Sequence, residues 1–217
     1  MRVLNLYAGI GGNRKLWQGY DITAVEYDEN IAKVYADLFP DDELIIGDAH
    51  LYLLEHHAEY DFIWSSPPCP THTRMNIANQ ISPYKDNTAQ LKQGGGIKPR
   101  YPSMTLYQEI ILLRHFYKGK YCVENVIAYY EPLIKPQEFG KHYFWCNFII
   151  SPNYEPSRGM GKNDNAKSLA VKKGFDWEKL KGLDRELVLR NCVEPETGLH
   201  ILECALGRQI QKSLFNE

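Results

Sequence analysis

The sequence feature that most constrains the fold is an alternation of short apolar runs with longer amphipathic stretches. The runs are almost continuously apolar, which is typical of strands buried on both faces. Between them, apolar residues recur at helical spacing. Strands that alternate with helices form right-handed βαβ units, so the sequence predicts an α/β fold with a doubly wound, mostly parallel sheet covered on both faces. The apolar runs cover residues 2–8, 22–27, 43–47, 60–66 and 120–126.

Two helices are predicted, over about 29–39 and about 102–117, and each has an apolar face that can pack on the sheet. The residues that form these faces are Ile31, Val34, Tyr35 and Leu38 in the first helix, and Leu106, Ile110, Leu113 and Phe116 in the second.

The rest of the chain is less regular. The run 144–150 predicts a further strand near an edge of the sheet, and residues 68–100 form a long connection rich in Pro, Asn, Thr and Gly. Connections of that length in a compact domain are usually functional or mobile. The predicted organisation is one α/β domain over 1–150, a small polar insertion over 151–185, and a helical C-terminal segment, 186–217, that returns to the domain.

Composition and charge narrow the class of protein. With 44% hydrophobic and 24% charged residues the chain is globular, and its formal charge of −2 excludes a uniformly basic protein that coats nucleic acid. The charges are nevertheless segregated. Residues 21–61 hold twelve acids and one base, 85–120 hold seven bases and two acids, and 158–190 hold nine bases and five acids. Charge runs are commonly solvated surface, but this segregation predicts a polarised molecule with one side facing a polyanion.

Membrane spans, a secretory signal and paired cysteines are the sequence features that bear on where the protein is located. No run of 18 apolar residues occurs, so no membrane span is predicted, and the N-terminus shows no secretory signal. The five cysteines are scattered without a C-x-x-C pair, which argues against a disulfide framework or a zinc ribbon. We therefore expect a cytoplasmic protein.

A glycine-rich turn, Ala8-Gly9-Ile10-Gly11-Gly12, directly follows the first predicted strand. Glycines at such a place let the backbone turn tightly and approach a ligand closely. Glu26 ends the second strand, where a carboxylate can accept from both hydroxyls of a ribose, and Asp48 ends the third, where it can accept from an adenine amino group. A turn of this kind alone can be purely structural, but with both acids it predicts a site for an adenosine-containing cofactor. Its spacing is not that of a G-x-G-x-x-G dinucleotide site.

Two further residues end neighbouring strands. Cys69 stands in Ser66-Pro67-Pro68-Cys69-Pro70, after the fourth strand, and Glu124 ends the fifth. An isolated cysteine is commonly a small core residue, and an isolated glutamate is commonly solvated or ion-paired. Open α/β sheets, however, bind ligands at this edge. We therefore interpret Cys69 as a nucleophile and Glu124 as an acid in the same site.

Taken together, these motifs resemble those of the DNA (cytosine-5) methyltransferases, which depend on S-adenosylmethionine (AdoMet). LNLYAGIGG resembles the family's cofactor loop, AVEYDENIAKVY its ribose-binding segment and GDA its adenine-binding turn. SPPCP resembles the nucleophile motif, ENV the glutamate motif, PSMTLYQEI the helix after the catalytic loop, and RNCV a late motif that returns to the methionine end of the cofactor. The motifs occur in the family's order over residues 2–205.

The resemblance implies a compact member of the kind found in bacteria or phages, with Cys69 and Glu124 as catalytic residues and no metal. It also implies that the insertion 151–185 serves target recognition. The cofactor-binding residues that it implies, for AdoMet and its product S-adenosylhomocysteine, are Tyr7, Ala8, Gly9, Gly11, Gly12, Glu26, Tyr27, Asp48, Ala49, Pro67, Leu106, Asn191 and Val193.

The chain also departs from the family's pattern. Asn5 stands where Asp is usual, and Pro70 where Gln is usual. The usual Gln-x-Arg-x-Arg segment is replaced by GKHYFW, so the donor to the cytosine O2 oxygen must be another residue. Lys141 and His142 are the nearest candidates in sequence register, although His142 can equally pack beside Trp145. For phosphate contacts from the long connection we predict Lys92, Lys98 and Arg100.

The resemblance implies double-stranded DNA as the partner and methyl transfer to C5 of cytosine as the reaction. Two alternatives stay open. The substrate can be tRNA, because related methyltransferases act on it, or the chain can be an AdoMet-binding subunit whose recognition comes from another chain. A second subunit or a homodimer is also compatible with the short recognition segment. No membrane partner is expected.

Overall fold

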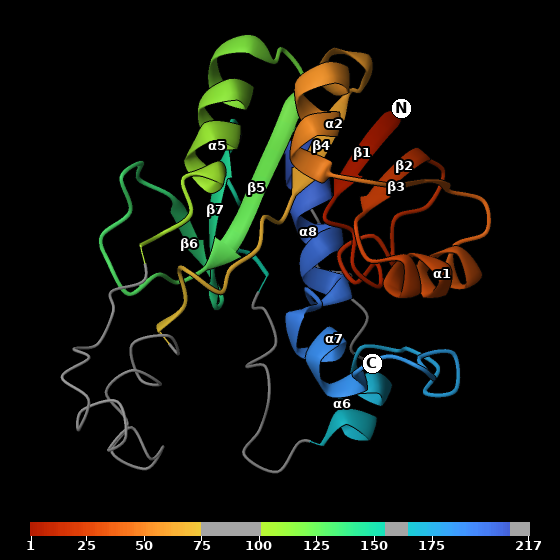
Figure 1. The fold of residues 1–217 in the computed structure, drawn as a ribbon. Helices are drawn as coiled ribbons and strands as arrows, with labels where there is room; N and C mark the ends of the chain where they lie inside the picture. Colours follow the sequence, from red (N-terminus) through yellow and green to blue (C-terminus); the bar gives the residue numbers. More distant parts are fainter. Residues whose placement is uncertain (75–100, 155–164, 209–217) are drawn as a thin grey trace, which may run out of the picture.

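The computed structural model describes residues 1–74, 101–154 and 165–208. Its centre is one seven-stranded sheet in the order β3-β2-β1-β4-β5-β7-β6 (Figure 1). The five strands from β3 to β5 are parallel, whereas β7 is antiparallel to both β5 and β6. The strands are β1 Arg2–Leu6, β2 Asp21–Glu26, β3 Glu43–Ile46, β4 Phe62–Ser65, β5 Lys120–Val126, β6 Gln137–Phe139 and β7 His142–Cys146.

Helices cover both faces of this sheet (Figure 1). Leu4 and Ile63 pack with α2 and α5 on one face, while Phe62 and Trp64, which point the opposite way because side chains alternate along a strand, pack with α8 on the other. Tyr35 of α1 packs on Ala24 of β2. The helices are α1 Glu29–Leu38, α2 Ala49–His56, the 3₁₀ turn η1 His57–Glu59, α5 Thr105–Phe116, α6 Ala166–Lys172, α7 Arg185–Asn191 and α8 Pro195–Ala205.

The predicted α/β fold with a mostly parallel sheet is confirmed. Two details of the prediction are wrong. The strand expected over 144–150 instead begins at His142 and ends at Cys146. Its predicted place near an edge of the sheet is confirmed, because its neighbour β6, a three-residue strand that was not predicted, forms the edge. Phe116, expected on the apolar face of α5, is 72% exposed, because it is the last residue of the helix and the buried aromatic ring there belongs to Tyr117.

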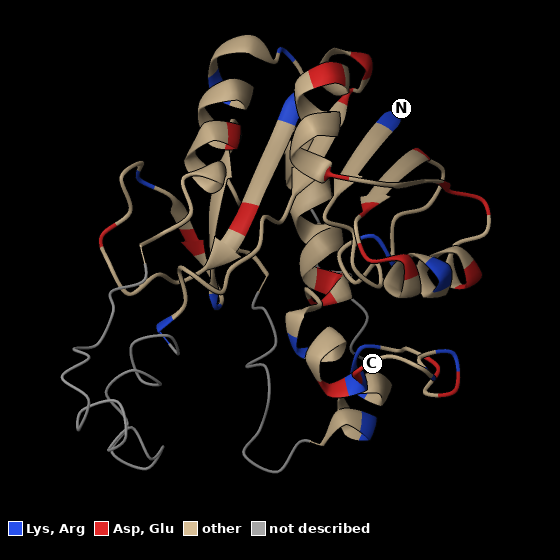
Figure 2. Cartoon of the chain, in the orientation of Figure 1, with Lys and Arg blue, Asp and Glu red and all other residues tan. Residues whose placement is uncertain are grey.

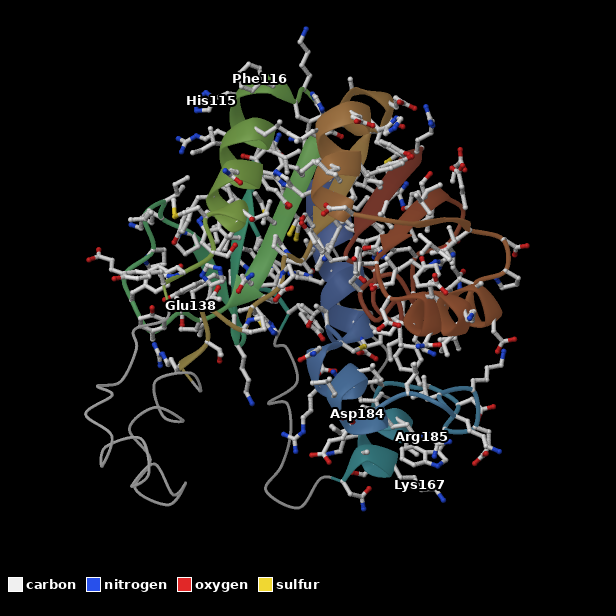
Figure 3. All side chains as sticks on the ribbon, in the orientation of Figure 1. His115, Phe116, Glu138, Lys167, Asp184 and Arg185 are labelled. Atoms are coloured by element: carbon white, nitrogen blue, oxygen red, sulfur yellow. The ribbon has the colours of Figure 1, made fainter. Side chains whose placement is uncertain are left out.

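The segment from α6 to α7 packs on the first half of the chain. Leu169 of α6 and Leu189 of α7 share a buried cluster with Ile10, and Ile31 and Val34 of α1 pack against it. Figure 3 shows Lys167, Asp184 and Arg185 at the end of the molecule opposite to His115 and Phe116. No helix in the described ranges is long and apolar enough to cross a membrane. The domain boundaries given above stay predictions.

Candidate active site

The C-terminal ends of the parallel strands surround a cavity of ≈640 Å³. Ligands bind at this edge in open α/β sheets because the strand-to-helix connections diverge there. The walls come from the residues that follow β1, β2, β3 and β4 and from the start of α5. The lining residues are Tyr7, Glu26, Tyr27, Asp48, Ala49, His50, Pro67, Pro68, Pro70, Thr71, His72, Ser103, Thr105 and Leu106.

In the glycine-rich turn after β1, the backbone of Gly11 and of Gly12 lies so close to other residues that a side chain would not fit. Gly11 has φ +75°, and a Cβ there would collide with the ring of Phe39, so a larger residue does not fit. Gly9 has φ +56°, and a Cβ on it would meet nothing within 4 Å, so its backbone faces open space that a ligand can approach. A Cβ on Gly12 would collide with Cys192 and Val193, which brings the RNCV segment against the turn.

Glu26 and Asp48 are both fixed by backbone amides. The Glu26 carboxylate accepts from the N–H of Gly9 at 2.8 Å and from the N–H of Asp28 at 2.9 Å, one bond to each oxygen. A carboxylate has about four acceptor positions, so both oxygens keep capacity for ribose hydroxyls. Asp48 is the N-cap of α2, and its Oδ1 accepts from the amides of His50 and Leu51. Both acids line the cavity, so their carboxylates can accept from the ribose hydroxyls and the adenine amino group of an adenosine.

Replacing Glu26 with alanine is expected to weaken AdoMet binding by about 1.5–3 kcal/mol, the range for hydrogen bonds to a charged group. Asp48→Ala should weaken it less, because an adenine amino group makes only one such bond. Calorimetric titration with AdoMet measures both, and Glu29→Ala, an exposed carboxylate in the first turn of α1, is the control. If both variants bind AdoMet as the wild type does, these strand-end carboxylates do not hold the cofactor.

The turn that carries Cys69 lies next to the end of β5, which carries Glu124. Burial raises the pKa of the Cys69 thiol above its usual value, and the nearby charge of Glu124 raises it further. The side-chain amide of Asn125 donates to the carbonyl of Pro67 at 2.8 Å, so the end of β5 is tied to the turn that carries the cysteine. The carbonyl of Cys69 accepts from the amides of His72 and Thr73. The two prolines on one side and these bonds on the other fix the backbone of the nucleophile.

His142 is the second side chain at Glu124. It lies on β7, which pairs with β5 so that Phe144 faces Glu124 and His142 faces Val126. Its Nε2 is 3.6 Å from Oε1 of Glu124, and 29% of its side chain is exposed. Its ring also makes an edge contact with Phe144, rather than with Trp145. Lys141, the other candidate, is exposed.

Several site residues were not predicted from the sequence. His72 is almost completely buried beside Cys69, and its Nδ1 lies 2.6 Å from the hydroxyl of Tyr130. Its Nε2 has no hydrogen-bond partner within the described ranges. His50 and Glu109 form a second unpredicted group. Their signal in the sequence is weak: Glu109 lies among the apolar residues of a helix, and His50 follows Asp48 by two positions.

Other predicted residues lie elsewhere. Val193 is buried and Asn191 is exposed, and both belong to the segment that packs on Gly12 rather than to the cavity lining. Ala8, the first residue of the glycine-rich turn, is buried and is not part of the cavity lining. Lys92, Lys98 and Arg100 lie outside the described residues, so their phosphate contacts stay a prediction.

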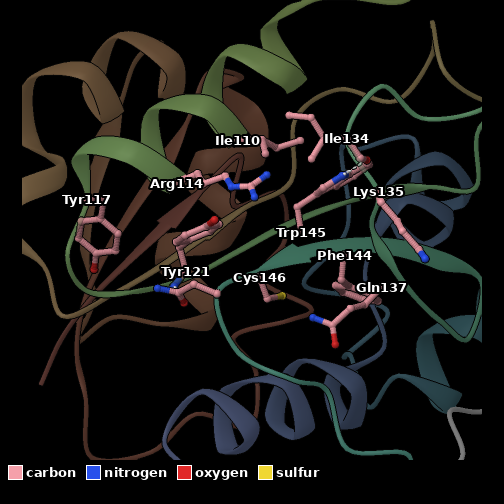
Figure 4. Close-up of a pocket in the computed structure, with 11 residues that line it drawn as sticks. Ile110, Arg114, Tyr117, Tyr121, Ile134, Lys135, Gln137, Phe144, Trp145 and Cys146 are labelled. Atoms are coloured by element: carbon pink, nitrogen blue, oxygen red, sulfur yellow. Dashed lines mark hydrogen bonds between the residues drawn. The ribbon is translucent and has the colours of Figure 1, made fainter.

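A second cavity, of ≈350 Å³, lies between the C-terminal half of α5 and the strands β5 to β7 (Figure 4). Arg114 and Lys135 contribute its positive charges, and Tyr121 and Trp145 contribute aromatic walls. None of the predicted site residues lines it.

The charge distribution is uneven (Figure 2). Acidic residues dominate along α1 and its connection to β3, whereas both signs occur along α6 and α7. Part of the basic segment is neutralised within the molecule, because Lys179 pairs with Asp37 at 3.1 Å and Lys173 pairs with Glu194 at 3.4 Å.

Comparison with known proteins agrees with this geometry. Residues 1–82 match the family model described as C-5 cytosine-specific DNA methylase. No curated protein matches the chain. Among solved structures, the methyltransferase EhMeth of Entamoeba histolytica is 13% identical over 95% of this chain and 98% of its own, with a TM-score of 0.51, which supports the fold.

Two further solved structures are similar over smaller parts. A DNA modification methyltransferase encoded within an Escherichia coli prophage is 16% identical over 79% of this chain and 55% of its own, with a TM-score of 0.42. Spodoptera frugiperda DNMT2 is 25% identical over 58% of this chain and 35% of its own, with a TM-score of 0.35. The resemblance seen in the sequence motifs is confirmed for residues 1–82, which carry the pattern of the C-5 cytosine-specific DNA methylases, a family that implies AdoMet-dependent methylation. The fold of the chain is similar to that of a methyltransferase.

Proposed function

We propose that this protein transfers a methyl group from AdoMet to C5 of cytosine in DNA, through a covalent bond between Cys69 and C6 of the flipped base. The observation that carries the proposal is the bond from Asn125 to Pro67, which holds the end of β5 with Glu124 against the turn of Cys69, next to a cavity that Glu26 and Asp48 line. Support comes from Pro67, Pro68 and Pro70, which flank Cys69 and line that cavity, where the methyl donor is proposed to bind.

The chemistry follows from the residues. C5 of cytosine is a poor nucleophile because it belongs to an aromatic ring. The Cys69 thiolate adds to C6, and Glu124 holds a proton at N3, so negative charge does not accumulate on the ring. C5 then has enamine character. AdoMet, when bound, supplies the methyl group, after which a base removes the C5 proton and the Cys69–C6 bond breaks. Since both C6 and C5 must be reached, the base has to leave the duplex.

His142 is proposed as the donor to the cytosine O2 oxygen, in place of the missing arginine. Support comes from its position 3.6 Å from Glu124 on the neighbouring strand. His142→Ala is expected to lower the rate of methyl transfer by about 10²-fold, as loss of one donor to developing charge does, and His142→Gln, which keeps a donor, should recover part of it. The exposed neighbour Lys141 gives the matched variant Lys141→Ala. Equal losses at both positions in a single-turnover assay would contradict the assignment.

DNA is proposed as the substrate, with Lys92, Lys98 and Arg100 on its phosphates and without a required second chain. The test is transfer of labelled methyl from AdoMet by the purified chain to duplex DNA and to tRNA, followed by bisulfite sequencing of the modified DNA. Label on C5 of cytosine in DNA supports the proposal. Label in tRNA alone makes the protein an RNA methyltransferase, and AdoMet binding without transfer to either points to a subunit that needs a partner.

A further inference from the structure

Glu109 is a buried carboxylate to which the mechanism above gives no role. It lies on α5 and has no exposed surface. Its Oε1 accepts from the hydroxyl of Tyr7 at 2.5 Å and lies 3.1 Å from Nδ1 of His50, while its Oε2 accepts from the hydroxyl of Ser65 at 2.5 Å. The three partners come from three separate segments, which follow β1, start α2 and end β4.

A carboxylate at this place is costly unless its neighbours compensate it. An apolar residue on the buried face of α5 would pack against the sheet without desolvating a charge. Here two hydroxyls donate to the two oxygens, and Nδ1 of His50 lies within hydrogen-bond distance of one of them, so polar groups compensate the burial of the carboxylate. Such an arrangement fixes its partners in turn, because each of them would leave Glu109 unsatisfied if it moved.

The fixed partners belong to the candidate active site. Tyr7 and His50 line the cavity, and Ser65 stands four residues before Cys69. Tyr7 has φ +55° and is the only residue other than glycine with a positive φ among the described residues. A bulky side chain is unfavourable in that conformation, and the bond from its hydroxyl to Glu109 holds it there.

Electrostatics agree with this geometry. Burial raises the pKa of the Tyr7 hydroxyl, and Glu109 raises it further, so the hydroxyl remains a donor. The hydrogen bond to Glu109 raises the pKa of His50, although burial opposes it, and the charge of Asp48 acts in the same direction as Glu109. The titratable groups that act on one another here are Tyr7, Asp48, His50 and Glu109.

We propose that Glu109 is a positioning residue for the methyl-donor cavity, which fixes Tyr7 and His50 in the wall and ties them to the strand that leads to Cys69. The inference rests on the proposed function, because it takes AdoMet as the occupant of the cavity. In this assignment Glu109 does not contact AdoMet itself. It acts through Tyr7 and His50, the two side chains in the wall of the cavity.

The test uses Glu109→Gln, which keeps the shape of the side chain and removes its charge. Proton NMR of the free protein follows the titration of His50, identified by its absence in His50→Asn. Calorimetry measures the affinity for S-adenosylhomocysteine. We expect His50 to titrate at a lower pH in Glu109→Gln than in the wild type, and the affinity to fall by at least about tenfold, as loss of hydrogen bonds to a charged group does.

Tyr7→Phe removes the hydrogen bond from the Tyr7 hydroxyl to Glu109, and it tests the positioning role if Glu109→Gln does not fold. Tyr117→Phe is the matched control, since the Tyr117 hydroxyl donates to the buried carbonyl of Tyr60, away from the cavity. Tyr7→Phe should bind the ligand more weakly and Tyr117→Phe should bind it normally.

The outcomes separate the two proposals. If Glu109→Gln binds S-adenosylhomocysteine as tightly as the wild type does, the positioning role alone is overturned. If Glu109→Gln does not fold, the same result with Tyr7→Phe overturns it. So does an unchanged titration of His50, or an equal loss of affinity in Tyr117→Phe and Tyr7→Phe. A wild-type protein that does not bind S-adenosylhomocysteine overturns the proposed cofactor and this inference together.

Discussion

Replacing Cys69 with serine is expected to abolish methyl transfer while AdoMet affinity stays within a few fold of the wild type. Serine keeps the shape of the side chain, but its hydroxyl does not ionise in the accessible pH range, and the thiolate is the nucleophile. The residues that hold the cofactor, Glu26 and Asp48 above all, are fixed by backbone amides that this substitution does not touch.

The decisive measurement is covalent trapping on DNA that contains 5-fluorocytosine. The fluorine at C5 blocks the final elimination, so the bond between Cys69 and C6 persists. The wild type should form the adduct and Cys69→Ser should not, whereas Cys204→Ser, a half-buried cysteine on α8, should trap like the wild type. An adduct that survives in Cys69→Ser, or none with the wild type, means that another group performs the attack or that no covalent bond forms.

The central strands of the parallel half of the sheet could be predicted from the sequence because they are buried on both faces, whereas β3 at its edge is partly exposed. Strands β1, β2 and β4 are buried almost throughout, so each is a nearly continuous apolar run. β5 begins and ends where its apolar run does. The same reasoning placed Glu26, Asp48 and Glu124 at one edge, since parallel strands bring their C-terminal ends together. The parallel direction of these strands then follows from their βαβ connections, whereas their order is known only from the structure.

The rest of the site depends on pairings that leave little mark on local sequence. β6 is three residues long and partly exposed, so it gives no apolar run. The approach of His142 to Glu124 results from antiparallel pairing of β7 with β5, and nothing in the GKHYFW segment specifies its direction. Glu109 looks like a polar interruption of an apolar helix face until the hydroxyls of Tyr7 and Ser65 are brought to it from positions 102 and 44 residues away.

Glu124 has two opposing effects on Cys69, and they give the second large prediction. In the free protein its charge adds to burial in raising the pKa of the Cys69 thiol, so the thiolate fraction at neutral pH is small and grows as the pH rises. When a cytosine is bound, a proton shared between Glu124 and N3 cancels that charge. Binding of the correct base would therefore favour the thiolate at the moment when it can attack C6.

Glu124→Gln removes the charge permanently and also removes the proton that must be held at N3. Methyl transfer should fall by at least about 10²-fold, the usual contribution of a positioned acid. Alkylation of Cys69 by iodoacetamide, followed by mass spectrometry of the labelled peptide between pH 6 and 9, should instead become faster, and its pH profile should shift to lower pH. Glu138→Gln, an exposed carboxylate on the edge strand β6, should change neither rate (Figure 3). If the thiol of Glu124→Gln labels at the wild-type rate throughout this range, Glu124 does not control the ionisation of Cys69, and its role is confined to the bound base.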